Sequence, residues 1–332
     1  MRKTTATLKR PLSVTAVIAL AATLSACGSS SDGTAASSDH VTIGVLQIAP
    51  AAIIDDTIKA FEKKLTSELG PDTEVTFKLK NANGDQSLIT SIARDFASSD
   101  MDAFAVIGTP AVIALAQQVR DKPIFALAIG DPVGSKVAKT LDEPGGNVTG
   151  SIDYVEPGKL LDDIEQADPK PASIGTVYDP SNQNMAIWSQ ALKKAADADG
   201  IKVVSATISG PSDVSAAARS LKGRTDAILI GPDATVLSAI DAVGAVSAAA
   251  KLPLYVVGGD VSVKGVLASI GPNYPALGEL AAIAAAKALD VGSAAKVPFG
   301  QPSKVEVSFN KDTMATLGIT FPQALLDSAT AP

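Results

Sequence analysis

The sequence has 332 residues, of which 46% are hydrophobic and 19% charged, with one Cys and one His. This length predicts two packed domains. The hydrophobic content excludes a disordered chain, and the lack of several apolar runs of about 20 residues excludes a polytopic membrane protein. A single His and a single Cys also exclude a His-ligated metal site, a Ser-His-Asp triad, a Cys-His pair and a paired-cysteine zinc site, whereas catalysis by carboxylates, Lys or a Ser-Lys pair stays open.

The charge is unevenly distributed along the chain. The formal net charge is −7, but residues 1–26 hold four of the 28 basic residues and none of the 35 acidic ones, so the remainder carries −11. A phosphate backbone would repel such a body, and the sequence has no basic stripe with interleaved aromatic residues. The charge pattern therefore argues against a nucleic-acid partner.

The N-terminal residues have the pattern of a secretion signal. A basic start precedes an apolar stretch from Val14 to Leu24, and the segment ends in Leu-Ser-Ala-Cys27, which matches the bacterial lipobox. In proteins with that motif the signal is cleaved before the Cys, which is then acylated, so we expect a signal peptide over residues 1–26 and lipidation at Cys27. An uncleaved anchor, or a secreted protein with an incidental Cys, is the alternative.

Residues 27–40 are expected to form a flexible tether. The run GSSSDGTAASSD is rich in Gly, Ser and Ala and has no apolar period. The only histidine, His40, lies at the edge of this run and is interpreted as solvated surface.

From Val41 onward, short β-branched runs alternate with longer Ala- and Leu-rich segments. The runs predict strands at residues 41–47, 74–79, 103–107, 124–128, 173–178, 202–207, 227–230, 254–257 and 305–309. Helices are expected between them at about residues 55–69, 86–98, 111–119, 157–166, 184–198, 212–221, 235–250 and 276–289.

This alternation predicts an α/β fold with parallel sheets covered by helices on both faces. The strands fall into two runs of about four, before Gly150 and after Ala172, and each run is typical of one doubly wound lobe. The Gly-rich segment from Gly145 to Tyr154 is interpreted as a crossover between them. The chain after Ala268 adds a strand-like run, a helix and a last strand, which indicates further crossings and a multi-strand hinge.

Polar residues follow many of the predicted strands. In open α/β sheets, ligands bind beyond the carboxyl ends of the strands. For each residue alone, a turn or a helix cap is an equally good interpretation. A polar cleft accounts better for so many positions in both lobes: Gln47, Asn81, Thr109, Asp131, Asp179, Asp233 and Asp260.

No motif predicts catalysis or a bound cofactor. The sequence lacks G-x-G-x-x-G after the first strand, G-x-x-x-x-G-K-[ST] and G-x-S-x-G. The pairs Asp55-Asp56 and Asp162-Asp163 are adjacent on expected helices and point in different directions, so they are interpreted as solvated faces. We therefore expect a protein that is not an enzyme and has no catalytic residue, cofactor or metal.

Four segments carry a more specific signal: NANGDQS (81–87), GTPAVIALAQ (108–117), DPVGSKVAKTLDEPGGNVTG (131–150) and VSFNKDTMATLGITFPQALLDSA (307–329). Together they resemble ABC transporter substrate-binding proteins of the tryptophan/tyrosine transport type. The similarity covers essentially the whole chain after the tether. It implies two Rossmann-like lobes, of the periplasmic-binding-protein type I kind, that close on a small ligand. We expect one lobe over residues 41–151 with about 271–298, and the other over 152–270 with about 299–329.

The resemblance also implies a set of ligand contacts. A zwitterionic amino acid needs a carboxylate partner for its ammonium group, which Asp233 and Asp260 can supply. Thr109 and the N–H groups that open the helix after Pro110 can hold its carboxylate. The resemblance places ligand-facing residues at Gln47, Asn81, Thr109, Asp131, Asp153, Asn184, Asp233 and Asp260, which together with Asp179 form the predicted site.

The chain departs from the family pattern at three positions that would contact the ligand. It has Ala49 where similar proteins commonly have His, Asn182 where they often have Glu, and Ala234 where Asn is common. Each change removes a family side chain able to hydrogen-bond a ligand. The resemblance therefore implies membership of the family more firmly than it implies specificity for aromatic amino acids. Apart from Phe, the aromatic residues that can stack on a ligand or pack in the core are Tyr154, Tyr178, Trp188, Tyr255 and Tyr274.

These features predict a lipid-anchored, extracytoplasmic solute-binding protein. It would capture a small polar molecule, an amino acid on the resemblance, by hinge closure and deliver it to an ABC permease and its ATPase. A receptor that feeds a membrane sensor, and a binding protein for a different class of solute, are the alternatives. The export signal and the absence of a helix-turn-helix argue against a transcription regulator.

Overall fold

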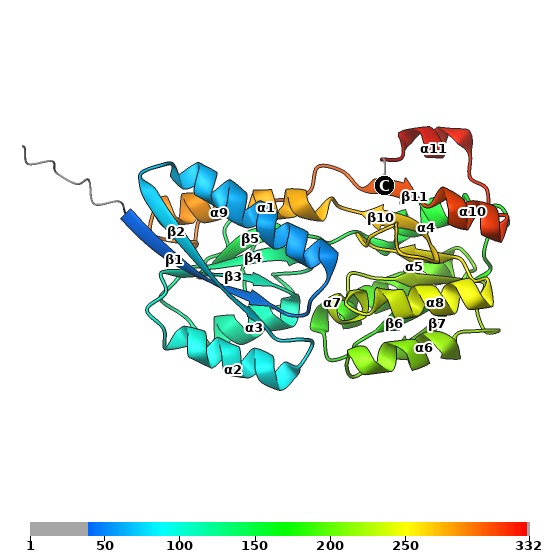
Figure 1. Cartoon of the computed structure of the whole chain (residues 1–332), viewed down its shortest axis with the longest axis horizontal. Helices are drawn as coiled ribbons and strands as arrows, with labels where there is room; N and C mark the ends of the chain where they lie inside the picture. Colours follow the sequence, from blue (N-terminus) through cyan, green and yellow to red (C-terminus); the bar gives the residue numbers. More distant parts are fainter. Residues whose placement is uncertain (1–38, 331–332) are drawn as a thin grey trace, which may run out of the picture. The chain divides into compact units, whose positions relative to one another are not determined.

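The fold consists of two sheets covered by helices, in a computed structural model that describes residues 39–330. The expected signal peptide, Cys27 and the tether up to residue 38 lie outside the described residues. The predicted α/β fold with two doubly wound lobes is confirmed (Figure 1).

The first sheet has five parallel strands in the order β2-β1-β3-β4-β5. Helices α1 and α9 pack together on one face, and α2 and α3 pack together on the other (Figure 1). Because both faces are covered, β3 and β4 are buried along their whole length. The elements of this first lobe are β1 (Asp39–Gln47), α1 (Ala52–Leu69), β2 (Thr73–Asn81), α2 (Gln86–Ala97), β3 (Ala103–Ile107), α3 (Thr109–Gln118), β4 (Ile124–Ile129), β5 (Val148–Ile152) and α9 (Tyr274–Asp290).

The second sheet has six strands in the order β11-β10-β9-β8-β6-β7, and only the β10–β11 pair is antiparallel. One core cluster contains Leu161 of α4 and Trp188 of α5, and another contains Val214 of α6 and Val243 of α8. The elements of this second lobe are α4 (Pro157–Ile164), β6 (Ser173–Tyr178), α5 (Gln183–Ala198), β7 (Lys202–Thr207), a 3-10 turn (Pro211–Asp213), α6 (Val214–Ser220), β8 (Ala227–Ile230), α7 (Ala234–Leu237), α8 (Ile240–Ala250), β9 (Leu254–Val256), β10 (Val266–Gly271), β11 (Glu306–Phe309), α10 (Lys311–Leu317) and α11 (Gln323–Ser328).

The chain passes between the two lobes after β5, after β10 and after α9. The last predicted helix packs on the first sheet, whereas the last predicted strand pairs with β10 in the second. The two lobes are therefore linked by several segments, as the sequence indicates.

The interpretation of residues 145–154 as a crossover alone is wrong, because they contain the buried strand β5. A Cβ atom on Gly150 would lie 2.0 Å from the carbonyl oxygen of Ala126 on β4. Glycine at this position thus permits two strands to approach closely rather than forming a turn.

The single helix expected over residues 235–250 is also wrong, since α7 and α8 are separate helices and Ala239 between them has φ −120° and ψ 25°. Helices α10 and α11 were not predicted.

Tyr255 in the second core offers a test of the packing. Its side chain is buried, and its hydroxyl has no hydrogen-bond partner among the described residues. We expect Tyr255→Phe to leave the free energy of unfolding unchanged or to raise it by up to about 1 kcal/mol, because it removes a buried polar atom without changing the packed ring. Tyr274→Phe, which removes a hydroxyl that donates a hydrogen bond, should instead lower it by about 1–2 kcal/mol. Urea denaturation followed by circular dichroism measures both free energies of unfolding. A larger loss of stability for Tyr255→Phe than for Tyr274→Phe would contradict this account.

Candidate functional site

A small cavity, here called the interlobe cavity, is lined by side chains from both lobes. Its polar lining consists of Thr109, Asp153, Asn182, Asn184 and Tyr274, and its volume is about 30 Å³. Gly108 follows β3, Ala128 lies near the end of β4 and Pro232 follows β8, so the cavity lies at the carboxyl ends of strands from both sheets. This is where open α/β sheets bind ligands.

Thr109 lies in the interlobe cavity at the start of α3. Its N-cap residue, Gly108, has φ +103° and provides no side-chain cap, and a Cβ atom on Gly108 would lie 2.6 Å from Cγ2 of Ile48. Only glycine fits this position without strain. The start of α3, with the positive end of its dipole, and the buried residue Thr109 thus both line the cavity, an arrangement suited to a carboxylate.

Asp153 follows β5 and is only 4% exposed. Its Oδ2 accepts a hydrogen bond of 2.8 Å from the Tyr274 hydroxyl, whereas its buried Oδ1 has no partner among the described residues. Burial raises the pKa of Asp153 to about 7, although the bond from Tyr274 and a backbone N–H oppose the rise. One oxygen of this carboxyl is thus available to a cation or an N–H donor.

Asn184 brings the second lobe to the same cavity. It lies in the first turn of α5, where the side chain of Asn182 caps the helix by accepting from the Asn184 N–H at 3.2 Å. A Cβ atom on Gly130 of the first lobe would lie 1.8 Å from Oδ1 of Asn184, so the amide packs directly against the Gly130 backbone. The Asn184 carboxamide is therefore held at the contact between the lobes.

The backbone is strained beside the cavity at Ala128. This residue has φ +61°, a left-handed conformation that costs a non-glycine residue about 1 kcal/mol or more. The pairing of β4 with β5 shifts register between Ala126 and Ile129, and the Ala128 N–H donates to Oγ of Ser151 at 3.1 Å. The resulting bulge turns the Ala128 side chain into the cavity lining.

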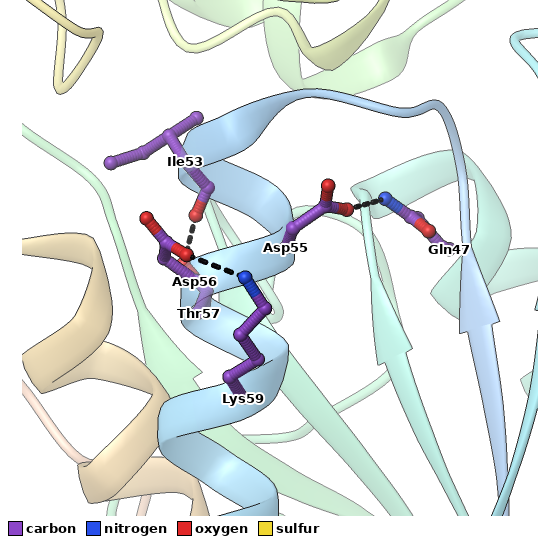
Figure 2. A network of polar contacts seen from close by, with 6 residues as sticks. All are labelled: Gln47, Ile53, Asp55, Asp56, Thr57 and Lys59. Carbon is purple, nitrogen blue, oxygen red and sulfur yellow. Dashed lines mark hydrogen bonds and ion pairs between the residues drawn. The ribbon is translucent and has the colours of Figure 1, made fainter.

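Gln47 and Asn81 lie together at the end of β1 and β2 but do not line the interlobe cavity. The Gln47 amide donates to Asp55 in the first turn of α1 at 2.6 Å, as Figure 2 shows. The Gln47 carbonyl oxygen accepts from Asn81 at 3.1 Å. These contacts join the strand ends to α1, and a role of either residue in ligand binding stays a prediction.

The other four predicted aspartates use their carboxylates in local turns and caps. Asp131, Asp179 and Asp260 each accept a hydrogen bond from a backbone N–H two or three residues further along the chain. Asp233 is fully buried and caps α7 while also accepting from the Asp179 N–H at 2.9 Å. Burial raises the pKa of Asp233 to about 6 against these hydrogen bonds. None of the four lines the interlobe cavity, and their role in ligand binding stays a prediction.

Of the predicted site, the structure brings Thr109, Asp153 and Asn184 together at the cavity. Sequence reasoning named Tyr274 only among the aromatic residues that can stack on a ligand or pack in the core. It did not place Tyr274 among the strand-end candidates, although this residue follows a strand-like run and opens a helix. It also missed the apolar lining formed by Ile48, Ile53, Ile54, Ile107 and Leu237. Trp188 and Tyr255 are core residues.

The size of the cavity constrains how it can be used. A volume of about 30 Å³ holds one or two water molecules. Sites for small organic ligands measure roughly 300–1,000 Å³. An amino acid can therefore enter only if the lobes move apart or the lining side chains rearrange.

Within residues 39–330, no helix has the length and apolar character needed to cross a membrane. The same residues contain no group of three or more His, Cys, Asp or Glu side chains arranged to hold a metal ion.

Comparison with known proteins connects this geometry to a family. The family model described as ABC transporter substrate binding protein matches residues 42–331. A tyrosine-binding protein from Clostridioides difficile (strain R20291) is 32% identical over 277 residues, which are 83% of this chain and 80% of that protein. An ABC domain from Streptococcus pneumonia, crystallised in complex with L-Trp, is 28% identical and has a TM-score of 0.83 over 88% of this chain and 99% of that one.

A third comparison is with a substrate-binding protein solved without ligand. A ligand-free, open structure of a substrate-binding protein with adhesive properties from Clostridium difficile is 30% identical, with a TM-score of 0.64 over 88% of this chain and 99% of that one.

Asp153 makes the stability of the protein depend on pH. The folded-state pKa values of Asp153, about 7, and Asp233, about 6, exceed the ordinary value of 3.8, so the folded state binds more protons than the unfolded state between pH 4 and 7. We expect the free energy of unfolding contributed by these groups to be greatest below pH 4 and to fall as the pH rises to 7. Urea denaturation across this range should give a shallower fall for Asp153→Asn than for the natural protein. Asp260→Asn, at an exposed turn, serves as the control, and identical slopes for all three proteins would refute this assignment.

Proposed function

The chain belongs to the ABC transporter substrate-binding protein family, and we propose that it captures an amino acid with an aromatic side chain between its two lobes. Members of this family bind substrates rather than convert them, so the expectation that the chain is not an enzyme is confirmed. The unpartnered Oδ1 of buried Asp153, at a cavity that both lobes line, is the observation that carries the proposal.

The polar groups of the cavity match the two charged ends of an amino acid. The free oxygen of Asp153 suits the ammonium group, and a charge-assisted hydrogen bond there would offset the cost of burying the carboxylate. The Thr109 hydroxyl and the uncapped start of α3 suit the carboxylate. This assignment replaces Asp233 and Asp260 as the ammonium partner, because Asp233 already accepts three backbone N–H bonds and Asp260 is exposed.

The apolar lining supports an aromatic side chain as the third recognised feature. Ile53, Leu237 and Tyr274 line the same cavity as the polar groups, and Ala234 presents a methyl group where the family commonly has Asn. The tyrosine-binding relative and the L-Trp-bound structure point to the same ligand class.

Capture would work by hinge closure. Thr109 belongs to the first lobe and Asn184 to the second, so a ligand can contact both only when the lobes are close together. Binding then shifts the population toward the closed form, which an ABC permease with its ATPase would recognise.

Calorimetric titration tests the ligand. The protein is first unfolded and refolded to remove carried-over ligand, then titrated with L-Trp, L-Tyr and L-Asn. We expect one-to-one binding of an aromatic amino acid, tighter at pH 8 than at pH 6 because the ammonium group requires the ionised form of Asp153. Asp153→Asn should weaken the affinity at least about 30-fold, since loss of one partner of a buried charge pair costs about 2 kcal/mol or more.

Asp199→Asn, which removes an exposed carboxylate outside the predicted site, is the matched control and should bind as tightly as the natural protein. Unaltered affinity in Asp153→Asn would contradict the assignment of the ammonium partner. If no amino acid binds, the ligand belongs to a different class of solute, which mass spectrometry of the ligand released on unfolding identifies.

We further propose that Cys27 carries a lipid that anchors the protein to the extracytoplasmic face of the cell membrane. The lipobox and the basic and apolar residues before it support this placement. Since the chain has no other Cys, any thiol-linked acyl group must be on Cys27. We expect the natural protein, expressed in bacteria, to incorporate labelled palmitate and to fractionate with membranes, and Cys27→Ser to lose both properties. Retention of label by Cys27→Ser would contradict the proposal.

A further inference from the structure

We propose that the first lobe carries a second binding site, for a phosphate-type oxyanion, in a cavity distinct from the interlobe cavity. This basic cavity has a volume of about 570 Å³ and is lined by Arg120, Lys136, Lys139, Ser135 and Gln183 among other residues. Its size is that of a small-molecule site.

The charge of the basic cavity is opposite to that of the chain. Three cationic side chains line it and no Asp or Glu does, in a protein whose formal net charge is −7. None of the ion pairs among the described residues includes Arg120, Lys136 or Lys139. No described carboxylate thus forms an ion pair with these three cations, and their positive charge would attract an anion.

Ser135, one of the residues that line the cavity, has a buried hydroxyl without a partner. Ser135 is 6% exposed, and its Oγ has no hydrogen-bond partner among the described residues. Buried hydroxyls are almost always paired, and an unpaired one costs about 1–3 kcal/mol. An oxyanion held by the neighbouring cations would accept the Ser135 proton and remove this cost.

The loop that carries these groups is held in one conformation. Oδ1 of Asp131 accepts from the Gly134 N–H at 2.7 Å, and the Lys139 N–H donates to the carbonyl of Pro144 at 2.8 Å. Gly145 has φ +69°, and a Cβ atom there would lie 2.7 Å from Cδ of Lys139, so the lysine stem lies directly over the glycine backbone. The backbone that carries these side chains is held in place, so an anion can bind without first ordering a flexible loop.

The second lobe contributes a further donor. Gln183, at the start of α5, lines the basic cavity, and its amide donates to the carbonyl of Gly134 at 3.1 Å. A phosphate-type group, with several acceptor oxygens and more than one negative charge, matches three cations, a hydroxyl and an amide better than a single carboxylate does.

Calorimetry of the full chain in a non-ionic detergent tests the proposal, at constant ionic strength because screening weakens such contacts. The probes are inorganic phosphate, which represents a free anion, and glycerol 3-phosphate, which represents a lipid headgroup. We expect saturable one-to-one binding of at least one probe, and the tighter probe identifies the source. Lys136→Gln/Lys139→Gln should weaken that binding at least about tenfold, and Ser135→Ala should weaken it several-fold without changing the circular dichroism spectrum.

Lys194→Gln/Lys202→Gln is the matched control, because it removes two exposed lysines that do not line the basic cavity. It makes the same change in net charge and should bind the probe as tightly as the natural protein. Absence of saturable binding of either probe would overturn the proposal. Equal weakening in the two double variants would also overturn it, since attraction would then come from net charge rather than from a built site.

Discussion

The hydrogen bond from Tyr274 to Asp153 joins two of the segments that pass between the lobes. Asp153 follows β5, the last strand of the first sheet, and Tyr274 opens α9, which returns to that sheet after β10. Both side chains are buried, so loss of the bond would remove the side-chain partner that the carboxyl has among the described residues. Gly258 of the second lobe lies against the same ring, since a Cβ atom there would be 2.2 Å from Tyr274. This hydrogen bond thus holds the segment after β5 and the start of α9 together, next to the second sheet.

The two oxygens of the Asp153 carboxyl have different roles. Oδ2 holds the hinge segments together, while Oδ1 of this cavity-lining residue has no partner among the described residues. Burial raises the pKa of Asp153 to about 7, which means that ionisation is costly until a positive charge arrives. On the proposed function, the ammonium group of the ligand supplies that charge and stabilises the ionised form. Ligand binding and hinge geometry are then coupled through a single side chain.

The two proposed sites differ in the charged side chains that line them. Most predicted acidic site residues are engaged with backbone N–H groups, and Asp153 is the aspartate that the interlobe cavity retains. The cations of the basic cavity have no ion-pair partner among the described residues, although the chain as a whole is acidic. One cavity thus suits a zwitterion with an apolar side chain and the other suits an anion. Gln183 and Asn184 are neighbours in α5, so the second lobe reaches both cavities through the same helix end.

The amino-acid sequence by itself determined the fold class and most of the elements, because hydrophobic period and residues that begin or end helices are local properties. It also determined that Thr109, Asp153 and Asn184 were candidates for one site, from strand ends and from family resemblance. Only the tertiary structure decided which candidates share a cavity, since a residue after a strand can cap a helix, as Asp233 does, or remain unpartnered, as one oxygen of Asp153 does. It also decided that Gly150 serves strand packing rather than a turn, because that depends on the carbonyl of Ala126, a neighbour distant in sequence. Burial and partner choice arise from contacts between segments far apart in the chain, and no local pattern encodes them.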